Sequence, residues 1–157
     1  MNADKKEGRY SRIAAQLEEL LKKDGDAISK MATIVAVLHP KMPHFFWTGF
    51  YRLVDTDLIA GPYQGPVACQ MLDRTKGVCR ACVDRCESII VPDVEAFPGH
   101  IPCDSRSKSE IVIPVYDGNG NVVAVLDVDS DRLNAFDETD RNGLEKIIAV
   151  FSRNSGL

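Results

Sequence analysis

The chain has 157 residues, of which 45% are hydrophobic, enough to bury one sizeable core. Its 19 basic and 23 acidic residues give a formal net charge of -4, so no surplus of positive charge favours nucleic acid or an anionic membrane. The longest apolar runs are far shorter than the roughly 20 residues that span a bilayer. The charged first residues lack the apolar stretch of a secretory signal. We therefore expect a single cytoplasmic domain over residues 1–157 that binds neither nucleic acid nor membrane.

The hydrophobic pattern predicts helices at both ends of the chain and antiparallel strands between them. The predicted ranges are N-terminal helices at 10–38, a sheet with its active-site loops at 45–130 and a C-terminal helix at 137–152. In the middle region, the second strand is expected to end at Ala60, before a Gly/Pro-rich connection. A short helix is expected at 80–86 and a long loop at 92–109. Helices around antiparallel strands describe an α+β domain.

Three carboxyl groups are predicted to converge at one end of the sheet. Asp127 and Asp129 lie two apart on a strand, so their side chains share a face. Glu110 begins the preceding strand and would lie near the same end. Close carboxylates cannot all ionise cheaply, so at least one would have a raised pKa and could act as a general acid. The alternative for Asp129 is that it ends the strand in water and caps the following turn.

Two aromatic residues are predicted to share a face of the first strand. Trp47 and Tyr51 lie on either side of Gly49, which is on the same face. The simplest interpretation is core packing. The functional interpretation is an aromatic wall for a small apolar group, with Gly49 leaving room for it.

Five cysteines are crowded into one part of the chain: Cys69, Cys79, Cys82, Cys86 and Cys103. In a reducing compartment such clustering indicates metal binding or thiol chemistry rather than a permanent disulfide framework. Cys82 and Cys86 lie four apart on the predicted helix, which is typical of thiols that simply pack. Together with other cysteines they could instead supply four thiolates to zinc or an iron–sulfur cluster, although the spacing is unorthodox.

Cys103 differs from the other cysteines because it lies among polar residues in the long loop. An exposed loop thiol is a candidate nucleophile, and a nearby second thiol would resolve its oxidised form. His44 and His100 are the available bases, but nothing in the sequence predicts that either lies beside a thiol.

Six segments in order, at compatible spacing, resemble the free methionine-(R)-sulfoxide reductases, a GAF-domain family. They are WTGFY at 47–51, GPVAC at 65–69, KGVC at 76–79, DVEAFPGHIPCD at 93–104, SKSEIVIP at 107–114 and VLDVDS at 125–130. The resemblance implies a six-stranded antiparallel GAF sheet flanked by helices and a homodimer. It also implies reduction of the free amino acid rather than of protein-bound methionine sulfoxide.

The resemblance further implies a role for each thiol. Cys103 is the catalytic cysteine, Cys79 resolves its sulfenic acid to a disulfide, and Cys69 is a third, auxiliary thiol. Asp129 is the carboxyl group that protonates the sulfoxide oxygen. An external dithiol, thioredoxin, then reopens the disulfide, and no metal or organic cofactor is needed.

Substrate recognition is implied by the same resemblance. Trp47 and Tyr51 match the pocket for the substrate methyl group, and Glu110 and Asp127 match active-site carboxylates. Selectivity for the free amino acid requires carboxylates that meet its ammonium group, and Glu110 and Asp127 are the candidates for that contact. The chain departs from the family at 80–86, where RACVDRC adds two cysteines. These either pack or pass the disulfide from Cys79 to the reductant.

Two other functions fit the same residues. GAF domains more often bind small ligands as sensors than catalyse, so the chain could be a non-catalytic small-molecule or redox-sensing module that uses its cysteine cluster. A thiolate metal site that acts as a redox sensor is the third interpretation.

Overall fold

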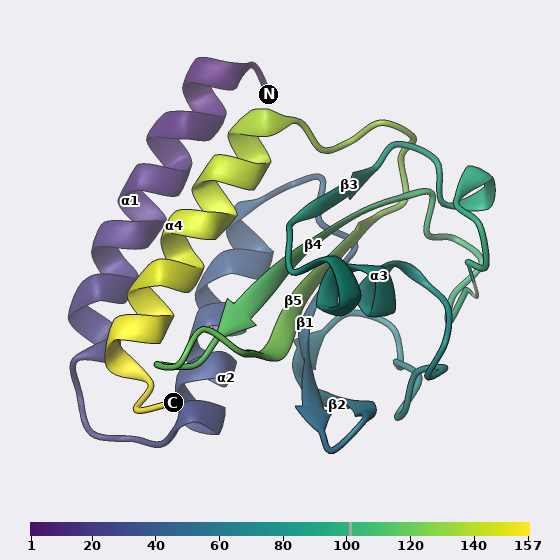
Figure 1. Cartoon of the computed structure of the whole chain (residues 1–157). Helices are drawn as coiled ribbons and strands as arrows, with labels where there is room; N and C mark the ends of the chain where they lie inside the picture. The colour runs from purple at the N-terminus through teal and green to yellow at the C-terminus, as the bar shows by residue number, and fades with distance from the viewer. Residues whose placement is uncertain (101) are drawn as a thin grey trace.

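The computed structural model describes residues 1–100 and 102–157, so Ile101 in the motif at 93–104 lies outside the described residues. The elements in chain order are α1 (Ala3–Leu21), α2 (Ala27–Leu38), the 3-10 turn η1 (His39–Lys41), β1 (Trp47–Val54), β2 (Asp57–Gln64), α3 (Val78–Arg85), β3 (Ile89–Val91), the 3-10 turn η2 (Val94–Ala96), β4 (Ser109–Tyr116), β5 (Val122–Ser130) and α4 (Glu138–Asn154). The predicted α+β class is confirmed, with helices at both ends of the chain and strands between them (Figure 1).

Over the described residues the strands form one antiparallel sheet in the order β2-β1-β5-β4-β3. The sheet therefore has five strands, and the expectation of six is wrong. Residues 70–72 run beside β2 and share with it an isolated bridge between Ile59 and Met71. The chain then leaves the sheet, because the Asp73 side chain accepts a hydrogen bond from the Thr75 backbone N–H and closes a turn.

Helices cover both faces of the sheet (Figure 1). Helices α1, α2 and α4 pack on one face, where Phe50 and Leu126 contribute to the larger core. Helix α3 covers part of the other face, where a smaller core includes Cys82 and Val125. Because neighbouring strand residues point to opposite faces, the alternation places Asp127 on the α3 side with Val125. This is the side on which the candidate site lies.

Two element boundaries differ from the prediction. Helix α1 begins at Ala3 rather than residue 10, because the Asn2 side chain accepts a hydrogen bond from the Lys5 backbone N–H and caps it. Strand β2 continues past Ala60 to Gln64. Pro62 does not end it, because β2 is an edge strand and Pro62 falls at a bulge in the pairing with β1. None of the described helices combines the length and apolar character that crossing a bilayer requires.

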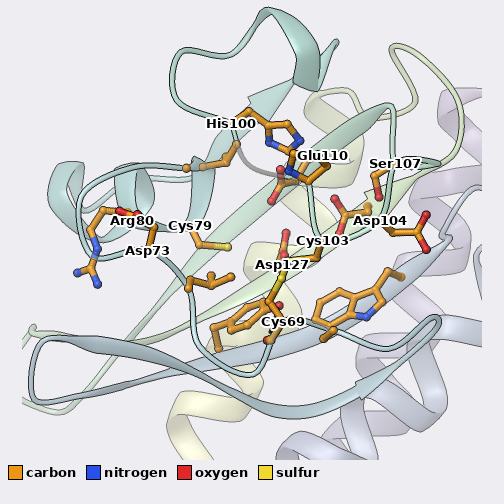
Figure 2. Close-up of a pocket in the computed structure, with 18 of the residues that line it drawn as sticks. Cys69, Asp73, Cys79, Arg80, His100, Cys103, Asp104, Ser107, Glu110 and Asp127 are labelled. Atoms are coloured by element: carbon orange, nitrogen blue, oxygen red, sulfur yellow. Dashed lines mark hydrogen bonds between the residues drawn. A yellow bond between two sulfur atoms is a disulfide. The ribbon is translucent and has the colours of Figure 1, made fainter.

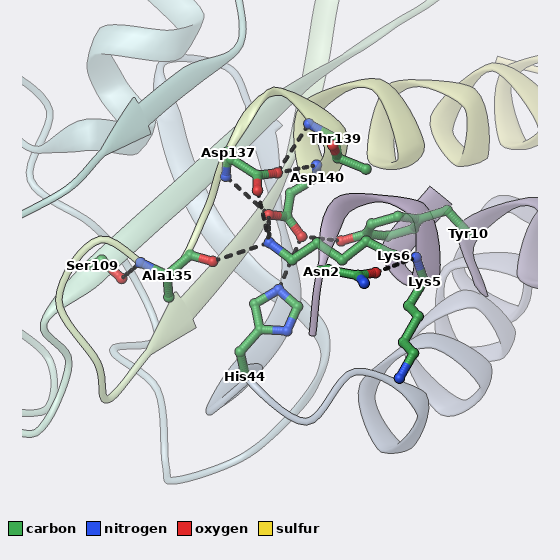
Figure 3. A network of polar contacts seen from close by, with 10 residues as sticks. All are labelled: Asn2, Lys5, Lys6, Tyr10, His44, Ser109, Ala135, Asp137, Thr139 and Asp140. Carbon is green, nitrogen blue, oxygen red and sulfur yellow. Dashed lines mark hydrogen bonds and ion pairs between the residues drawn. The ribbon is translucent and has the colours of Figure 1, made fainter. Parts of the chain in front are cut away.

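A buried polar cluster fixes α1 and α4 to the chain that leads into β1 (Figure 3). The Asp140 carboxylate accepts hydrogen bonds from Lys6 Nζ at 2.5 Å and from the Tyr10 hydroxyl at 2.7 Å. His44 Nε2 lies 2.9 Å from the same carboxylate. His44 is thereby committed to a structural contact, away from the thiols.

Candidate functional site

A cavity of about 150 Å³ opens between the α3 side of the sheet and the loops at 66–77 and 102–107 (Figure 2). It is smaller than the roughly 300–1,000 Å³ typical of sites for drug-sized ligands. The eight residues predicted to form the site all line it: Trp47, Tyr51, Cys69, Cys79, Cys103, Glu110, Asp127 and Asp129. Sequence reasoning therefore selected residues that the fold brings together from three strands, two loops and a helix.

The disulfide of the site joins Cys103 to Cys69, and the two Cα atoms lie 5.7 Å apart. Cys79, the expected partner of Cys103, is a free and buried thiol on α3. The expected pairing is thus wrong for the state that the structure describes. Cys69 is available to Cys103 because it lies in the loop that lines the same cavity wall, where the Tyr51 hydroxyl approaches its carbonyl oxygen at 3.4 Å.

The loop that carries Cys103 is held by an ion pair beside it. The Arg106 guanidinium donates two hydrogen bonds to the Asp104 carboxylate, at 3.0 and 2.7 Å. These bonds lower the pKa of Asp104 to about 2. Arg106 also lies over the Phe46 ring, 5.0 Å from its centre, at the start of β1. The contacts hold the exposed Cys103 close to the sheet.

The predicted convergence of three carboxyl groups is confirmed. Asp129 on β5 lies directly opposite Trp47 on β1 and Glu110 on β4, and Asp127 follows on the same face. Burial raises the pKa of Glu110 well above its usual value, and the charges of Asp127 and Asp129 raise it further. Burial and the charge of Asp127 likewise raise the pKa of Asp129. Burial and the repulsion between these groups therefore both favour the protonated form of the carboxyl groups.

Cys79 faces these carboxyl groups from α3. The helix begins after Gly77, whose φ of 100° favours glycine, and the turn directs Cys79 into the core. Burial raises the pKa of the Cys79 thiol, and Asp127 and Glu110 raise it further. The Cys79 sulfur and one carboxylate oxygen each of Glu110 and Asp127 lie within 4.8 Å of one another, so the three could hold a metal ion.

The other two thiols of α3 do not join this site. Cys82 is fully buried in the smaller core and Cys86 is exposed, and neither lines the cavity. Burial, with Asp127 and Cys86 nearby, raises the pKa of Cys82 to about 12. Among the described residues, the cysteines do not gather into the four-thiolate group considered from the sequence. Packing therefore accounts for Cys82.

A third ring, Tyr63, packs against the aromatic wall without lining the cavity, and sequence reasoning missed it. Trp47 stacks with both tyrosines, and its ring centre lies 5.7 Å from that of Tyr51 and 5.3 Å from that of Tyr63. A Cβ atom on Gly49 would lie 2.5 Å from the Trp47 indole and 2.4 Å from Tyr63 Cβ. Gly49 therefore makes room for the indole and not, as interpreted from the sequence, for a ligand. Tyr63 was missed because the second strand was expected to end at Ala60.

His100, one of the two bases considered from the sequence, also lines the cavity. Its Nε2 atom is buried and has no hydrogen-bond partner among the described residues. Burial lowers its pKa, while Glu95 opposes that shift. The sequence signal for this position was that His100 lies in the same long loop as the candidate nucleophile Cys103.

Together these features can support two-electron thiol chemistry on a small molecule. The Cys103 thiol can attack, Cys69 lies within bonding range, and a buried carboxyl group can deliver a proton. The stacked rings suit an apolar or cationic end of the ligand. The carboxyl groups suit a cationic end.

Comparison with known proteins agrees with this geometry. Residues 31–153 match the GAF domain. GAF domain-containing protein A of Dictyostelium discoideum is 48% identical over 147 residues, which cover 92% of this chain and 91% of that protein. The free methionine-R-sulfoxide reductase of Escherichia coli is 34% identical over 144 residues, covering 92% and 87%. The X-ray structure of the Neisseria meningitidis free methionine-R-sulfoxide reductase with its substrate superimposes with a TM-score of 0.87, at 36% identity, covering 93% and 87%.

Proposed function

Because this chain belongs to the GAF-domain family of the free methionine-R-sulfoxide reductases, we propose that it reduces free L-methionine-(R)-sulfoxide to methionine. The observation that carries the proposal is the disulfide between Cys69 and Cys103 at the edge of a small cavity with an aromatic wall and buried carboxyl groups. A permanent structural disulfide would not need a cavity of this chemistry beside it.

In the first step the Cys103 thiolate attacks the sulfoxide sulfur. The Asp129 carboxyl group gives its proton to the sulfoxide oxygen, because that oxygen would otherwise depart as a costly anion. The oxygen is transferred to Cys103, which becomes a sulfenic acid, and methionine leaves as the reduced thioether. The raised pKa of Asp129 supports this role, since a proton donor must hold its proton near neutral pH.

In the second step a thiol condenses with the sulfenic acid, forms a disulfide and releases water. Cys69 performs this step, because it is the cysteine bonded to Cys103. Two electrons from an external dithiol, thioredoxin, then reopen the bond by exchange. The cycle needs no metal or organic cofactor.

Selectivity for the free amino acid comes from the buried carboxylates. Glu110 and Asp127 receive the substrate ammonium group, while Trp47 and Tyr51 contact its methyl group. A residue inside a polypeptide has no such ammonium group to offer.

Two further properties are carried over from the family resemblance and the chemistry. The protein acts as a homodimer, which sedimentation at micromolar concentration would test. It works in the cytoplasm, where thiol reductants keep catalytic cysteines in use.

A coupled assay tests the proposal. Oxidation of NADPH with thioredoxin and thioredoxin reductase is followed with free L-methionine-(R)-sulfoxide, its S epimer and a peptide-bound R-sulfoxide. We expect consumption with the free R epimer alone, and loss of that consumption in Cys103→Ser. Cys86→Ser is the matched control, because this cysteine is exposed and outside the cavity.

Two results would contradict the proposed reductase activity. Full turnover by Cys103→Ser would remove the nucleophile from the mechanism. No turnover with any of the three sulfoxides, using either thioredoxin or dithiothreitol, would favour a GAF module that binds its ligand without consuming it.

A further inference from the structure

Three potential metal ligands meet inside the cavity, in the region shown in Figure 2. The Cys79 Sγ atom and one carboxylate oxygen each of Glu110 and Asp127 lie within 4.8 Å of one another. The residues come from α3, β4 and β5, and they are exposed by 5%, 5% and 6%, respectively. Three separate, well-packed elements therefore hold them together.

The group lacks a positive partner. The Asp127 Oδ1 atom is buried and has no hydrogen-bond partner among the described residues. None of the ion pairs found in the described part of the chain involves Glu110 or Asp127. The nearby Arg80 instead donates to the Thr56 carbonyl oxygen at 2.7 Å. A buried carboxylate oxygen without a donor is costly, and a cation would offset that cost.

The structure assigns to Cys79, Glu110 and Asp127 a binding site for Zn²⁺, in which the metal occupies the cavity and inhibits the protein. One thiolate with two carboxylates is a donor set for zinc, whereas Mg²⁺ and Ca²⁺ take oxygen ligands alone. Three protein ligands leave the fourth tetrahedral position open toward the cavity. Binding displaces the thiol proton and any proton on the carboxyl groups.

The spacing is close to what zinc needs. Zinc bonds of about 2.3 Å to sulfur and about 2.0–2.2 Å to oxygen put ligand atoms roughly 3.3–3.7 Å apart in a tetrahedron. Rotation of the side chains by about 1 Å at their ends closes the gap from the observed spacing.

The site also has a functional consequence. Glu110 and Asp127 are the carboxylates proposed to receive the substrate ammonium group, so zinc and substrate compete for them. This competition rests on the proposed function. The metal site itself rests on the geometry of the three ligands alone.

A cobalt titration tests the metal site directly. Co²⁺ replaces Zn²⁺ in such sites, and a bound thiolate gives it a near-ultraviolet charge-transfer absorption that zinc then removes. We expect one metal per chain, with an affinity at least about tenfold weaker in Cys79→Ser and in Asp127→Asn. Cys86→Ser keeps the wild-type affinity. Circular dichroism shows that each variant is folded before it is titrated, and Asp127→Asn preserves the side-chain shape if Cys79→Ser does not fold.

Metal binding by the oxidised protein distinguishes this site from one formed by a cluster of cysteines. None of the three ligands takes part in the disulfide between Cys69 and Cys103. Metal binding therefore persists when that disulfide is formed. Loss of binding on oxidation, unchanged binding in Cys79→Ser, or no binding at all would each overturn the proposal.

Competition is measured on Cys103→Ser, which binds substrate without turnover. Free L-methionine-(R)-sulfoxide should lower the apparent affinity of this variant for zinc. Zinc binding without reductase activity in the wild type would leave the metal site standing and remove the proposed function. Reductase activity without zinc binding would support the proposed function and remove the metal site.

Discussion

The sulfur of Cys103 is bonded to that of Cys69, although 34 positions separate them in the chain. Cys79, which is nearer to Cys103 in sequence, lies free among buried carboxyl groups. Cys69 thus lies at the exposed edge of the cavity, whereas Cys79 lies inside it. Because of this difference, substitutions of Cys69 and of Cys79 should have different effects on turnover.

We expect Cys69→Ser to stop the cycle at the Cys103 sulfenic acid, because the nearest thiol is gone. Turnover should fall at least about tenfold. One equivalent of substrate, followed by a sulfenic-acid probe and peptide mass spectrometry, locates the oxidised sulfur. In Cys79→Ser the same treatment should give the bond between Cys69 and Cys103. A bond between Cys79 and Cys103 in the wild type would return the resolving role to Cys79.

Asp129→Asn removes the proposed proton donor while preserving its shape. The first step should slow by about 10²–10⁴-fold, in kcat more than in KM, because the oxygen then leaves without protonation. Single-turnover formation of methionine measures the step independently of the reductant. Asp131→Asn is the control, since that residue is exposed and lies just beyond the strand. Equal loss in both variants would contradict the role of Asp129.

The shared face of Asp127 and Asp129 could be predicted from the sequence because strand alternation is a local rule. The approach of Glu110 required only a regular hairpin, and the pairing of Glu110 with Asp129 confirms it. The disulfide partner was beyond such rules, because loop residues far apart in sequence carry no periodicity. The family resemblance pointed to three thiols that line the same cavity, but not to the pair that is bonded.

The missing sixth strand has the same kind of cause. Residues 70–72 have the pairing of a strand but not its length, because the turn at Asp73 ends them. Likewise, a proline such as Pro62 normally ends a strand because it has no backbone N–H to donate. Here its position at a bulge in an edge strand accommodates it. Both outcomes depend on which strands lie next to each other in the sheet, and the sequence alone does not give that order.

Gly49→Ala should disturb the aromatic wall. The added Cβ atom would overlap the Trp47 indole and Tyr63, so the rings must move or the strand must shift. We expect a loss of about 1–3 kcal/mol in the free energy of unfolding and a raised KM for the free sulfoxide. Urea denaturation and initial rates measure the two effects. Gly118→Ala, where the nearest atom would be at 3.5 Å, should change neither.

The two additional thiols of α3 should behave as ordinary residues. Cys82→Ser should cost about 1–3 kcal/mol of stability, because it buries a hydroxyl without a partner. Cys86→Ser should change stability by less than about 0.5 kcal/mol. Turnover with thioredoxin and with dithiothreitol should be unchanged in Cys86→Ser. A slower rate with thioredoxin alone would instead establish that Cys86 passes the disulfide to the reductant.

Asp140→Asn tests the polar cluster at the other side of the fold. Burial would raise the pKa of Asp140, but the hydrogen bonds from His44, Lys6 and Tyr10 lower it well below its usual value. A folded-state pKa below the unfolded value of about 3.9 stabilises the fold above that pH and loses this contribution as the pH falls below it. At pH 7 the variant should therefore lose about 3–5 kcal/mol, since Lys6 is left partly unpaired in the core.

The pH dependence distinguishes this electrostatic loss from a loss of packing. The stability difference between wild type and Asp140→Asn should shrink as the pH is lowered from about 5 toward 2, because the wild-type carboxylate is itself being protonated. Thermal unfolding across that range measures it, with Asp24→Asn, an exposed carboxylate, as the control. A difference that stays constant with pH would mean that shape, and not the charge of Asp140, holds α1 to α4.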